Sequence, residues 1–314
     1  MTAVAARQAA RIEVIAPSGA HLSVEAFDAA VSALRARGHS VRCDVPREGW
    51  QRFSDTDDAR LEQVHRAARA KDVDVVMIAR GGYGLSRLLD RIDWALVAAS
   101  ATRGMRWVGY SDFTAFQLAL LARTGARSFA GPGVSGDFGV ATPDAFMLAH
   151  FDALVEGRLL PVEWTEAHPA GAPAVAEPID GTLWGGNLSL VAGLVGTPFL
   201  PAVEDGLLFL EDVSEHPYRV ERMLHQLLYA GVLSRQRAIV LGAFTDWKPA
   251  PHDNGYDLGA VVDYFRSRLQ VPIVTGLPFG HVPRKAVLAV GERYRLESAD
   301  AGWRLAPVDA AGSA

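Results

Sequence analysis

The sequence is poor in cysteine, in long apolar runs and in excess charge of either sign. Cys43 is the only cysteine among 314 residues, which excludes an internal disulfide and a cysteine-rich zinc site. No apolar run approaches the roughly 18 residues that span a bilayer, and no signal-peptide pattern follows Met1. The net charge of −5 argues against nucleic-acid binding. We therefore expect a cytoplasmic protein that binds neither membrane nor nucleic acid.

Motifs of metal and cofactor sites are also missing. The chain has no H-E-x-x-H motif and no histidine pair at ligand spacing on one helix. Its glycine-rich segment, Arg80-Gly81-Gly82-Tyr83-Gly84, is neither a G-x-G-x-x-G fingerprint nor a Walker A loop with its lysine. We expect neither a metal nor a cofactor.

What is present is an ordinary globular composition with an alternating pattern. Hydrophobic residues make up 49% of the chain and charged residues 21%, which is enough apolar material for a core. Strand-like runs at Ile12–Ala16 and Val73–Ile78 alternate with helix-like runs at Val24–Arg37 and Asp55–Ala70. Alternating strands and helices predict an α/β fold, with a parallel sheet covered on both faces.

The stretch from 156 to 180 differs in composition from the rest. It contains four prolines, which interrupt helices and central strands. These are Pro161, Pro169, Pro173 and Pro178. We interpret 156–180 as a linker between an N-terminal domain, 1–155, and a C-terminal domain, 181–308. Residues 309–314 are expected to form a tail.

The segment Gly109-Tyr110-Ser111-Asp112-Phe113 predicts a reactive serine. It follows a strand-like run, Met105–Val108, and opens a helix-like one. A serine at such a corner has an exposed hydroxyl, and the helix N-terminus favours a developing oxyanion. The context is that of a nucleophile elbow, although Phe113 replaces the last glycine of G-x-S-x-G. The alternative is that Ser111 or Asp112 caps the helix.

The glycine-rich segment Arg80–Gly84 directly follows the strand-like run Val73–Ile78. Its three glycines allow backbone N–H groups to approach a ligand closely. Ligands of doubly wound sheets bind at the carboxyl ends of strands, where this segment and Ser111 would both lie. The alternative is a tight turn without a ligand.

A reactive serine needs a base, usually a histidine oriented by a carboxylate. His281 is a candidate base, because it lies in a loop after the strand-like pair Ile273-Val274. Glu211-Asp212 ends the strand-like run Leu207–Leu210 and can face the same crevice. The alternative for this acid pair is a helix cap or a surface position.

Five segments, taken in order, resemble the LD-carboxypeptidases, a family of serine peptidases that includes the muramoyltetrapeptide carboxypeptidases of peptidoglycan recycling. They span most of the chain up to about residue 290. They are Ala79–Gly84, Gly109–Ala115, Gly185–Ser189, Leu210–Val213 with Pro217–Arg219, and Gly280-His281.

The resemblance implies a catalytic triad of Ser111, Glu211 and His281. It implies an oxyanion hole formed by the backbone N–H of Asp112 and one from the Gly81-Gly82 loop. The implied fold is a flavodoxin-like parallel-sheet domain that carries the serine, followed by a β-rich α/β domain that carries the glutamate and the histidine. The active site would lie at the domain interface, often in a homodimer. Glu215, four residues after Glu211, is the main competitor for the acid.

The resemblance also implies a substrate, the murein tetrapeptide. The scissile amide would join an L-configured diamino acid, meso-diaminopimelate or lysine, to a terminal D-alanine. The terminal carboxylate needs a cation, because burying that charge unpaired is costly. Arg80 and Arg219 are candidates for this cation, and Tyr83 is a further candidate substrate contact. Ala130 departs from the family pattern, which often has a histidine before the following Gly-Pro.

Two other functions remain open. Microcin C immunity peptidases share the implied fold and triad but cleave acyl or peptidyl nucleotides, and they differ in the glycine loop. The second is a non-catalytic α/β protein whose glycine loop binds an anion. It predicts binding without turnover.

Overall fold

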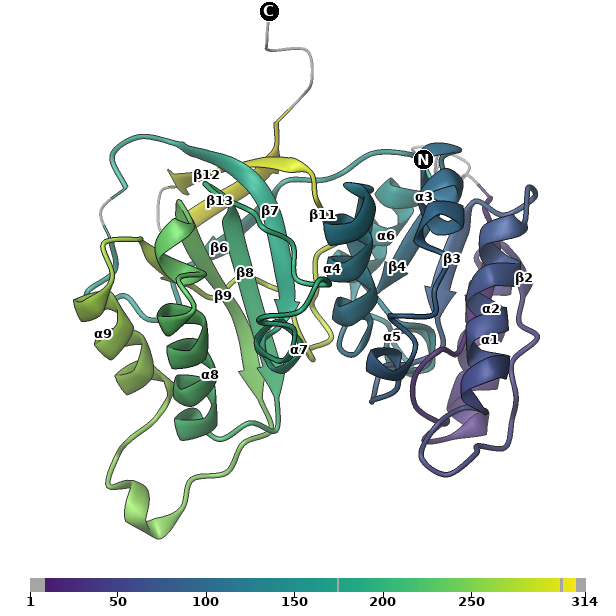
Figure 1. The fold of residues 1–314 in the computed structure, drawn as a ribbon, viewed down its shortest axis with the longest axis horizontal. Coiled ribbons are helices and arrows are strands. Elements are labelled where there is room, and N and C mark those ends of the chain that lie inside the picture. Colours follow the sequence, from purple (N-terminus) through teal and green to yellow (C-terminus); the bar gives the residue numbers. More distant parts are fainter. Residues whose placement is uncertain (1–8, 174, 300–301, 309–314) are drawn as a thin grey trace, which may run out of the picture.

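The computed structural model describes residues 9–173, 175–299 and 302–308. It contains two sheets side by side (Figure 1). Helices α4 (Phe113–Thr124) and α7 (Leu188–Gly193) lie between them, beside strand β11 (Leu288–Val290) at the edge of the first sheet. The tail expected at 309–314 lies outside the described residues. No helix within the described ranges is both long and apolar enough to cross a membrane.

Helices and strands alternate from residue 11 to residue 130 and again from residue 179 to residue 275. The helices are α1 (Val24–Ala36), α2 (Asp57–Arg69), α3 (Trp94–Thr102), α4 (Phe113–Thr124), α5 (Val134–Phe138), α6 (Ala145–Val155), α7 (Leu188–Gly193), α8 (Pro217–Tyr229) and α9 (Leu258–Arg268), with short 3-10 turns η1 (Leu85–Arg87), η2 (Leu233–Arg235) and η3 (Pro251–Asp253). The strands are β1 (Arg11–Ile15), β2 (Ser40–Arg42), β3 (Val75–Ile78), β4 (Arg106–Gly109), β5 (Ser128–Ala130), β6 (Val162–Thr165), β7 (Ile179–Asn187), β8 (Leu207–Val213), β9 (Ala238–Thr245), β10 (Ile273–Thr275), β11 (Leu288–Val290), β12 (Arg293–Ala299) and β13 (Gly302–Pro307).

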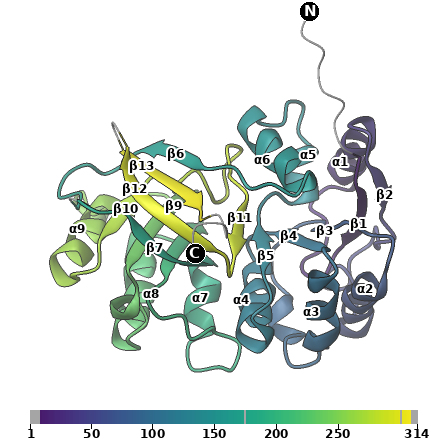
Figure 2. The same cartoon turned by 90° about the horizontal axis from the view of Figure 1, so that it is seen from above.

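The first sheet confirms the predicted flavodoxin-like arrangement. Its parallel strands run in the order β2-β1-β3-β4-β5, which is the order of that fold. Helices α1, α5 and α6 cover one face, and α2, α3 and α4 cover the other (Figure 2). All four residues of β3 are buried, as expected for a strand covered on both faces.

The second sheet is mixed. Strands β10, β9, β8 and β7 are parallel, and β12, β13 and β6 follow in antiparallel pairing. In the register of β7 and β8, Asn187 lies beside Glu211. This pairing brings the ends of two parallel strands, and the motifs they carry, to one edge of the sheet.

The predicted division into two domains and a linker stays a prediction. Two strands pair across its boundaries. Strand β6 lies within the expected linker 156–180 and pairs with β13 of the second sheet. Strand β11 lies within the expected C-terminal domain and pairs with β5 of the first sheet, Leu288 beside Ala130. The chain therefore returns from the second sheet to the first after the loop that carries His281.

The predicted helices form for local reasons. Ser23 caps α1 by accepting a hydrogen bond from the Ala26 N–H, and Phe27, Val31 and Leu34 are buried on one face at helical spacing. Helix α4 differs, because all residues from 113 to 120 are buried. It contacts the first sheet on one side and β7 and α7 on the other. The N-terminal end of α4 therefore lies between the two sheets.

Candidate active site

Ser111 lies at the turn between β4 and α4 in a left-handed backbone conformation, with φ of 62°. A non-glycine residue in this conformation is strained, as the serine of a nucleophile elbow is. Ser111 O accepts a hydrogen bond from the Thr114 N–H at 2.9 Å, so the serine is joined to the first turn of α4. Asp112 is the N-cap residue of α4, but among the described residues its side chain makes no capping hydrogen bond.

Asp112 instead connects the serine corner to the glycine loop. Its buried carboxyl accepts a hydrogen bond from the Leu85 N–H at 2.9 Å. Burial raises the pKa of Asp112, while the nearby backbone N–H groups oppose this rise. The loop is fixed from its other side, where Gly81 O accepts a hydrogen bond from the Gly19 N–H at 3.1 Å.

Gly81 faces the serine directly. A Cβ at Gly81 would lie 2.7 Å from Ser111 Oγ and 3.4 Å from the backbone N of Asp112. The absent side chain therefore leaves a space bounded by the serine hydroxyl and a helix N-terminus. Among the described residues, nothing accepts a hydrogen bond from the Asp112 or Gly82 N–H. These N–H groups are available to an oxyanion in that space.

Glu211 and His281 contact each other across a separation of 70 residues. His281 Nδ1 lies 2.8 Å from Glu211 Oε2, and the glutamate side chain is fully buried. Glu211 lies at a register irregularity where the β8–β9 pairing skips from Leu210 to Asp212. Gly280, with φ of 132°, approaches so closely that a Cβ there would lie 3.1 Å from Glu211 Oε2. The carboxylate can therefore select the histidine tautomer with a proton on Nδ1.

Glu215, the competing acid, lies 3.7 Å from the Arg219 guanidinium. The structure thus brings Glu211 next to His281 and pairs Glu215 with an arginine of α8. The roles of Glu211, His281 and Ser111 in catalysis stay predictions.

His281 also approaches the residue that precedes the serine. The rings of Tyr110 and His281 are 4.9 Å apart, whereas no hydrogen bond joins Ser111 Oγ to His281 in the part of the chain described. Catalytic hydrogen bonds of free enzymes are often long and tighten only when substrate binds. The imidazole therefore lies close to the serine corner without a formed serine–histidine bond.

A buried ion pair lies behind Tyr110 and was not predicted. Lys285 Nζ is 2.7 Å from Asp137 Oδ1 and 3.8 Å from the centre of the Tyr110 ring. Burial raises the pKa of Asp137 and of Tyr110, and Lys285 opposes the rise for Asp137. These three side chains and His281 line a pocket of about 300 Å³. Of Tyr110, Asp137 and Lys285, the sequence pointed only to Tyr110, because it directly precedes Ser111.

The three candidate substrate contacts lie in different surroundings. Arg80 is partly buried beside the glycine loop and donates a hydrogen bond to Ala20 O at 2.7 Å. No carboxylate of a described residue forms an ion pair with it, and burial lowers its pKa. Tyr83 is 43% exposed and packs against Phe53. Arg219 lies on α8 and is half exposed.

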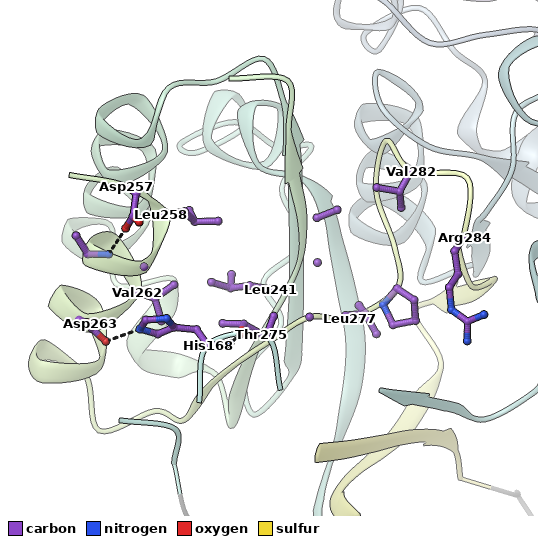
Figure 3. A pocket seen from close by; sticks show the side chains of 17 residues that line it. His168, Leu241, Asp257, Leu258, Val262, Asp263, Thr275, Leu277, Val282 and Arg284 are labelled. Atoms are coloured by element: carbon purple, nitrogen blue, oxygen red, sulfur yellow. Dashed lines mark hydrogen bonds and ion pairs between the residues drawn. The ribbon is translucent and has the colours of Figure 1, made fainter. Parts of the chain in front are cut away.

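A larger cavity, of about 720 Å³, lies between α9 and the second sheet. Its lining is mainly apolar, with the His168–Asp263 contact of 2.8 Å on one side and Val282 and Arg284 on the other (Figure 3). Neither Ser111, Glu211 nor His281 lines it. Of these three candidate residues, His281 lines the smaller pocket instead. Within the described ranges, no three histidine, cysteine or carboxylate side chains are grouped to bind a metal ion.

Two family models together match most of the chain, and both describe the family that the sequence motifs resemble. Residues 12–131 match the model of the LD-carboxypeptidase N-terminal domain, and residues 180–296 match that of the C-terminal domain. The murein tetrapeptide carboxypeptidase of Pseudomonas aeruginosa is 30% identical over 306 residues, which cover 93% of this chain and 95% of that protein.

Solved structures agree. The muramoyltetrapeptide carboxypeptidase from Oxalobacter formigenes superposes with a TM-score of 0.86 and 43% identity, over 95% of this chain and 99% of the other. The microcin C7 self-immunity protein MccF, in complex with aspartyl sulfamoyl adenosine, gives a TM-score of 0.81 at 20% identity over 96% of each chain, which shows a shared fold alone. Both domain models, the curated relative and the Oxalobacter structure lead to one conclusion: the chain belongs to the LD-carboxypeptidase family of serine peptidases.

Proposed function

We propose that the chain hydrolyses the amide between an L-configured diamino acid, meso-diaminopimelate or lysine, and the terminal D-alanine of murein tetrapeptides. The observation that carries this proposal is the contact of His281 with buried Glu211, 2.8 Å long, with the His281 ring 4.9 Å from the ring of Tyr110, the residue before the strained Ser111. The names of the two relatives at 30% and 43% identity support the substrate. The family supports a role in peptidoglycan recycling, in the cytoplasm and as a homodimer.

The mechanism follows from the positions of these groups. Ser111 Oγ attacks the scissile carbonyl carbon while His281 Nε2 takes its proton. Glu211 Oε2 accepts the Nδ1–H hydrogen bond and stabilises the imidazolium. The N–H groups of Asp112 and of the Gly81-Gly82 loop donate to the oxyanion. The tetrahedral intermediate collapses, the C–N bond breaks, and His281 returns the proton to the departing D-alanine amine. Water then hydrolyses the acyl-enzyme by the same route.

The test is release of D-alanine from L-Ala-γ-D-Glu-mDAP-D-Ala and from its lysine analogue, measured with a D-amino-acid oxidase assay. We expect turnover of at least one of the two. Aspartyl sulfamoyl adenosine serves as the alternative substrate, because MccF has been solved with it. Cleavage of the nucleotide conjugate without D-alanine release would favour the microcin-type function. Binding of either compound without turnover would favour a non-catalytic protein.

Gly81→Ala is expected to lower kcat for D-alanine release by about 10²–10³, the range for loss of one oxyanion donor. The new methyl would lie 2.7 Å from Ser111 Oγ, in the space proposed for the oxyanion. Gly193→Ala is the matched control, because a Cβ at Gly193 meets nothing within 4 Å. Equal kcat values for both variants, at unchanged thermal stability, would mean that the glycine loop is not part of the oxyanion hole.

Arg80→Ala is expected to raise KM for the tetrapeptide about ten-fold or more, with little change in kcat. The reason is that Arg80 is a partly buried cation without a carboxylate partner among the described residues, and the D-alanine carboxylate would supply one. Steady-state kinetics of Arg80→Ala and Arg219→Ala compare the two candidates. A raised KM in Arg219→Ala together with an unchanged KM in Arg80→Ala would place the carboxylate site at α8 instead.

A further inference from the structure

Asn187 lies between the helix that follows the serine and the strand that carries the glutamate. Its backbone N–H donates to Thr114 Oγ1 at 3.0 Å. Its side-chain Nδ2 donates to Glu211 Oε1 at 3.3 Å and to Asp212 Oδ1 at 3.0 Å. We infer that Asn187 is a positioning residue that orients Glu211 toward His281 and relates this pair to the serine corner. The inference rests on the catalytic roles proposed above.

A continuous path of hydrogen bonds passes through Asn187. The Thr114 N–H donates to Ser111 O at 2.9 Å, and Thr114 Oγ1 accepts from the Asn187 N–H. Asn187 Nδ2 reaches one oxygen of Glu211, and His281 Nδ1 contacts the other at 2.8 Å. Each bond joins a different element, so the path connects α4, β7, β8 and the histidine loop. Asn187 therefore links the serine side of the site, on α4, to the glutamate side, on β8.

Two glycines before Asn187 allow this close approach. A Cβ at Gly186 would lie 2.5 Å from Thr114 Oγ1, and a Cβ at Gly185 would lie 1.9 Å from Phe209 O. Both glycines have positive φ, 129° and 131°, in a region that side chains disfavour. Residues 185–187 therefore act as one unit, in which the glycines remove the steric barrier and Asn187 makes the polar contact.

Asp212 is held by several other hydrogen bonds and does not depend on Asn187 for its orientation. Glu211 is therefore the group that Asn187 orients. Asp212 Oδ2 accepts from Ser189 N and Ser189 Oγ at 2.9 and 2.6 Å, and Oδ1 accepts from the Val213 N–H at 2.8 Å. Glu211 has fewer partners, Asn187 on Oε1 and His281 on Oε2. Because Glu211 is fully buried, solvent cannot replace the Asn187 donor. Among the described residues, losing it leaves the imidazole as the remaining side-chain partner of the carboxylate.

The test variant is Asn187→Ser, which separates orientation from helix capping. Asn187 Oδ1 also caps α7 by accepting from the Leu190 N–H at 3.4 Å, and serine is an equally good N-cap residue. The shorter serine side chain cannot extend to Glu211. The backbone N–H bond to Thr114 is retained. Folding is checked by thermal unfolding, which should differ little from that of the wild type.

Two readouts report on orientation. We expect kcat for D-alanine release to fall about 10- to 100-fold, the range for one hydrogen bond to a charged group, with KM nearly unchanged. We also expect the titration midpoint of His281, followed by ¹⁵N-histidine NMR and assigned with His281→Gln, to rise. Glu211 without its other donor stabilises the protonated imidazole more strongly.

The remaining titratable groups near His281 are the same in both proteins. Tyr110 contacts the imidazole ring, and Asp137, Asp144 and Lys285 line the same pocket. Asp212 also loses the Asn187 donor, and a variant that removes a different hydrogen bond of Asp212, Ser189→Ala, controls for this loss. A change in the midpoint therefore reports on Glu211.

Ser189→Ala is the matched control at the start of the same helix, because it removes the hydroxyl bond to Asp212 without touching Glu211. It should retain both kcat and the midpoint. An unchanged His281 midpoint in Asn187→Ser overturns the inference, whatever happens to kcat, since Asn187 would then have only a structural role. The NMR readout needs no substrate, so it stands even if the wild type releases no D-alanine, which would contradict the proposed function alone.

Thr114→Val provides a second variant, for the case that Asn187→Ser does not fold. Valine keeps the shape of threonine but removes the acceptor for the Asn187 N–H. We expect kcat to fall about ten-fold with an unchanged His281 midpoint, because the serine corner loses its link while Glu211 keeps its donor. A kcat equal to that of the wild type would contradict the link between the serine side and the glutamate side of the site.

Discussion

Ser111→Ala is expected to lower kcat for D-alanine release by about four orders of magnitude or more, with the fold intact. The substitution removes the proposed nucleophile and leaves the oxyanion donors and substrate contacts in place, which alone supply a small residual rate. Release of D-alanine is followed over long incubations, so that a low rate is distinguished from zero. A fall of this size would identify the nucleophile and the reaction class together.

The control for this variant is another serine in the same backbone conformation. Ser214 has φ of 61°, is exposed and has no place in the proposed mechanism. Ser214→Ala should keep kcat within about two-fold, since exposed side chains away from a site contribute little. Equal D-alanine release by Ser111→Ala and the wild type would mean that the left-handed corner is a structural feature and that the triad is assigned wrongly.

Glu211→Gln is expected to lower kcat by about 10³–10⁴, the second largest effect. The wild-type carboxylate accepts a hydrogen bond from His281 Nδ1 at 2.8 Å, so the other ring nitrogen, Nε2, is left unprotonated and can act as the base. The glutamine amide can donate to Nδ1 instead, which moves the proton to Nε2 and disables the base. The imidazolium that forms during the reaction also loses its counter-charge.

Glu215→Gln is the matched control for the acid. It removes the same charge four residues away, where the carboxylate pairs with Arg219 rather than with His281. Exposed ion pairs of this kind contribute little, so kcat should stay within about two-fold. Steady-state kinetics of both variants, with folding followed by circular dichroism, decide between the acids. A large fall in Glu215→Gln beside an active Glu211→Gln would reverse the assignment.

Locally determined features could be predicted from the sequence. The helix predicted over 24–37 is observed at Val24–Ala36, and the one predicted over 55–70 at Asp57–Arg69. Both have caps and one buried face, which depend on neighbours along the chain. The turn that carries Ser111 follows the same rule, since a strand, a short polar corner and a helix succeed one another within ten residues.

Long-range features escaped prediction. Strand β11 returns to the first sheet beside β5, and β6 joins the second sheet from within the expected linker. Short strands of three or four residues have no periodicity that identifies their partner. The Asp137–Lys285 pair joins residues from α5 and the histidine loop, and neither has a distinguishing neighbour in sequence.

The sequence by itself determined the α/β class, the serine corner, the glycine loop and the resemblance to the family, because each depends on a contiguous segment. Tertiary structure decided which carboxylate contacts His281, since that depends on the β8–β9 irregularity and on a loop that crosses between the sheets. It also decided that Asn187 contacts Thr114 and Glu211 at once. Such contacts arise from strand register and close backbone approach between residues 24 to 73 positions apart, which no local pattern encodes.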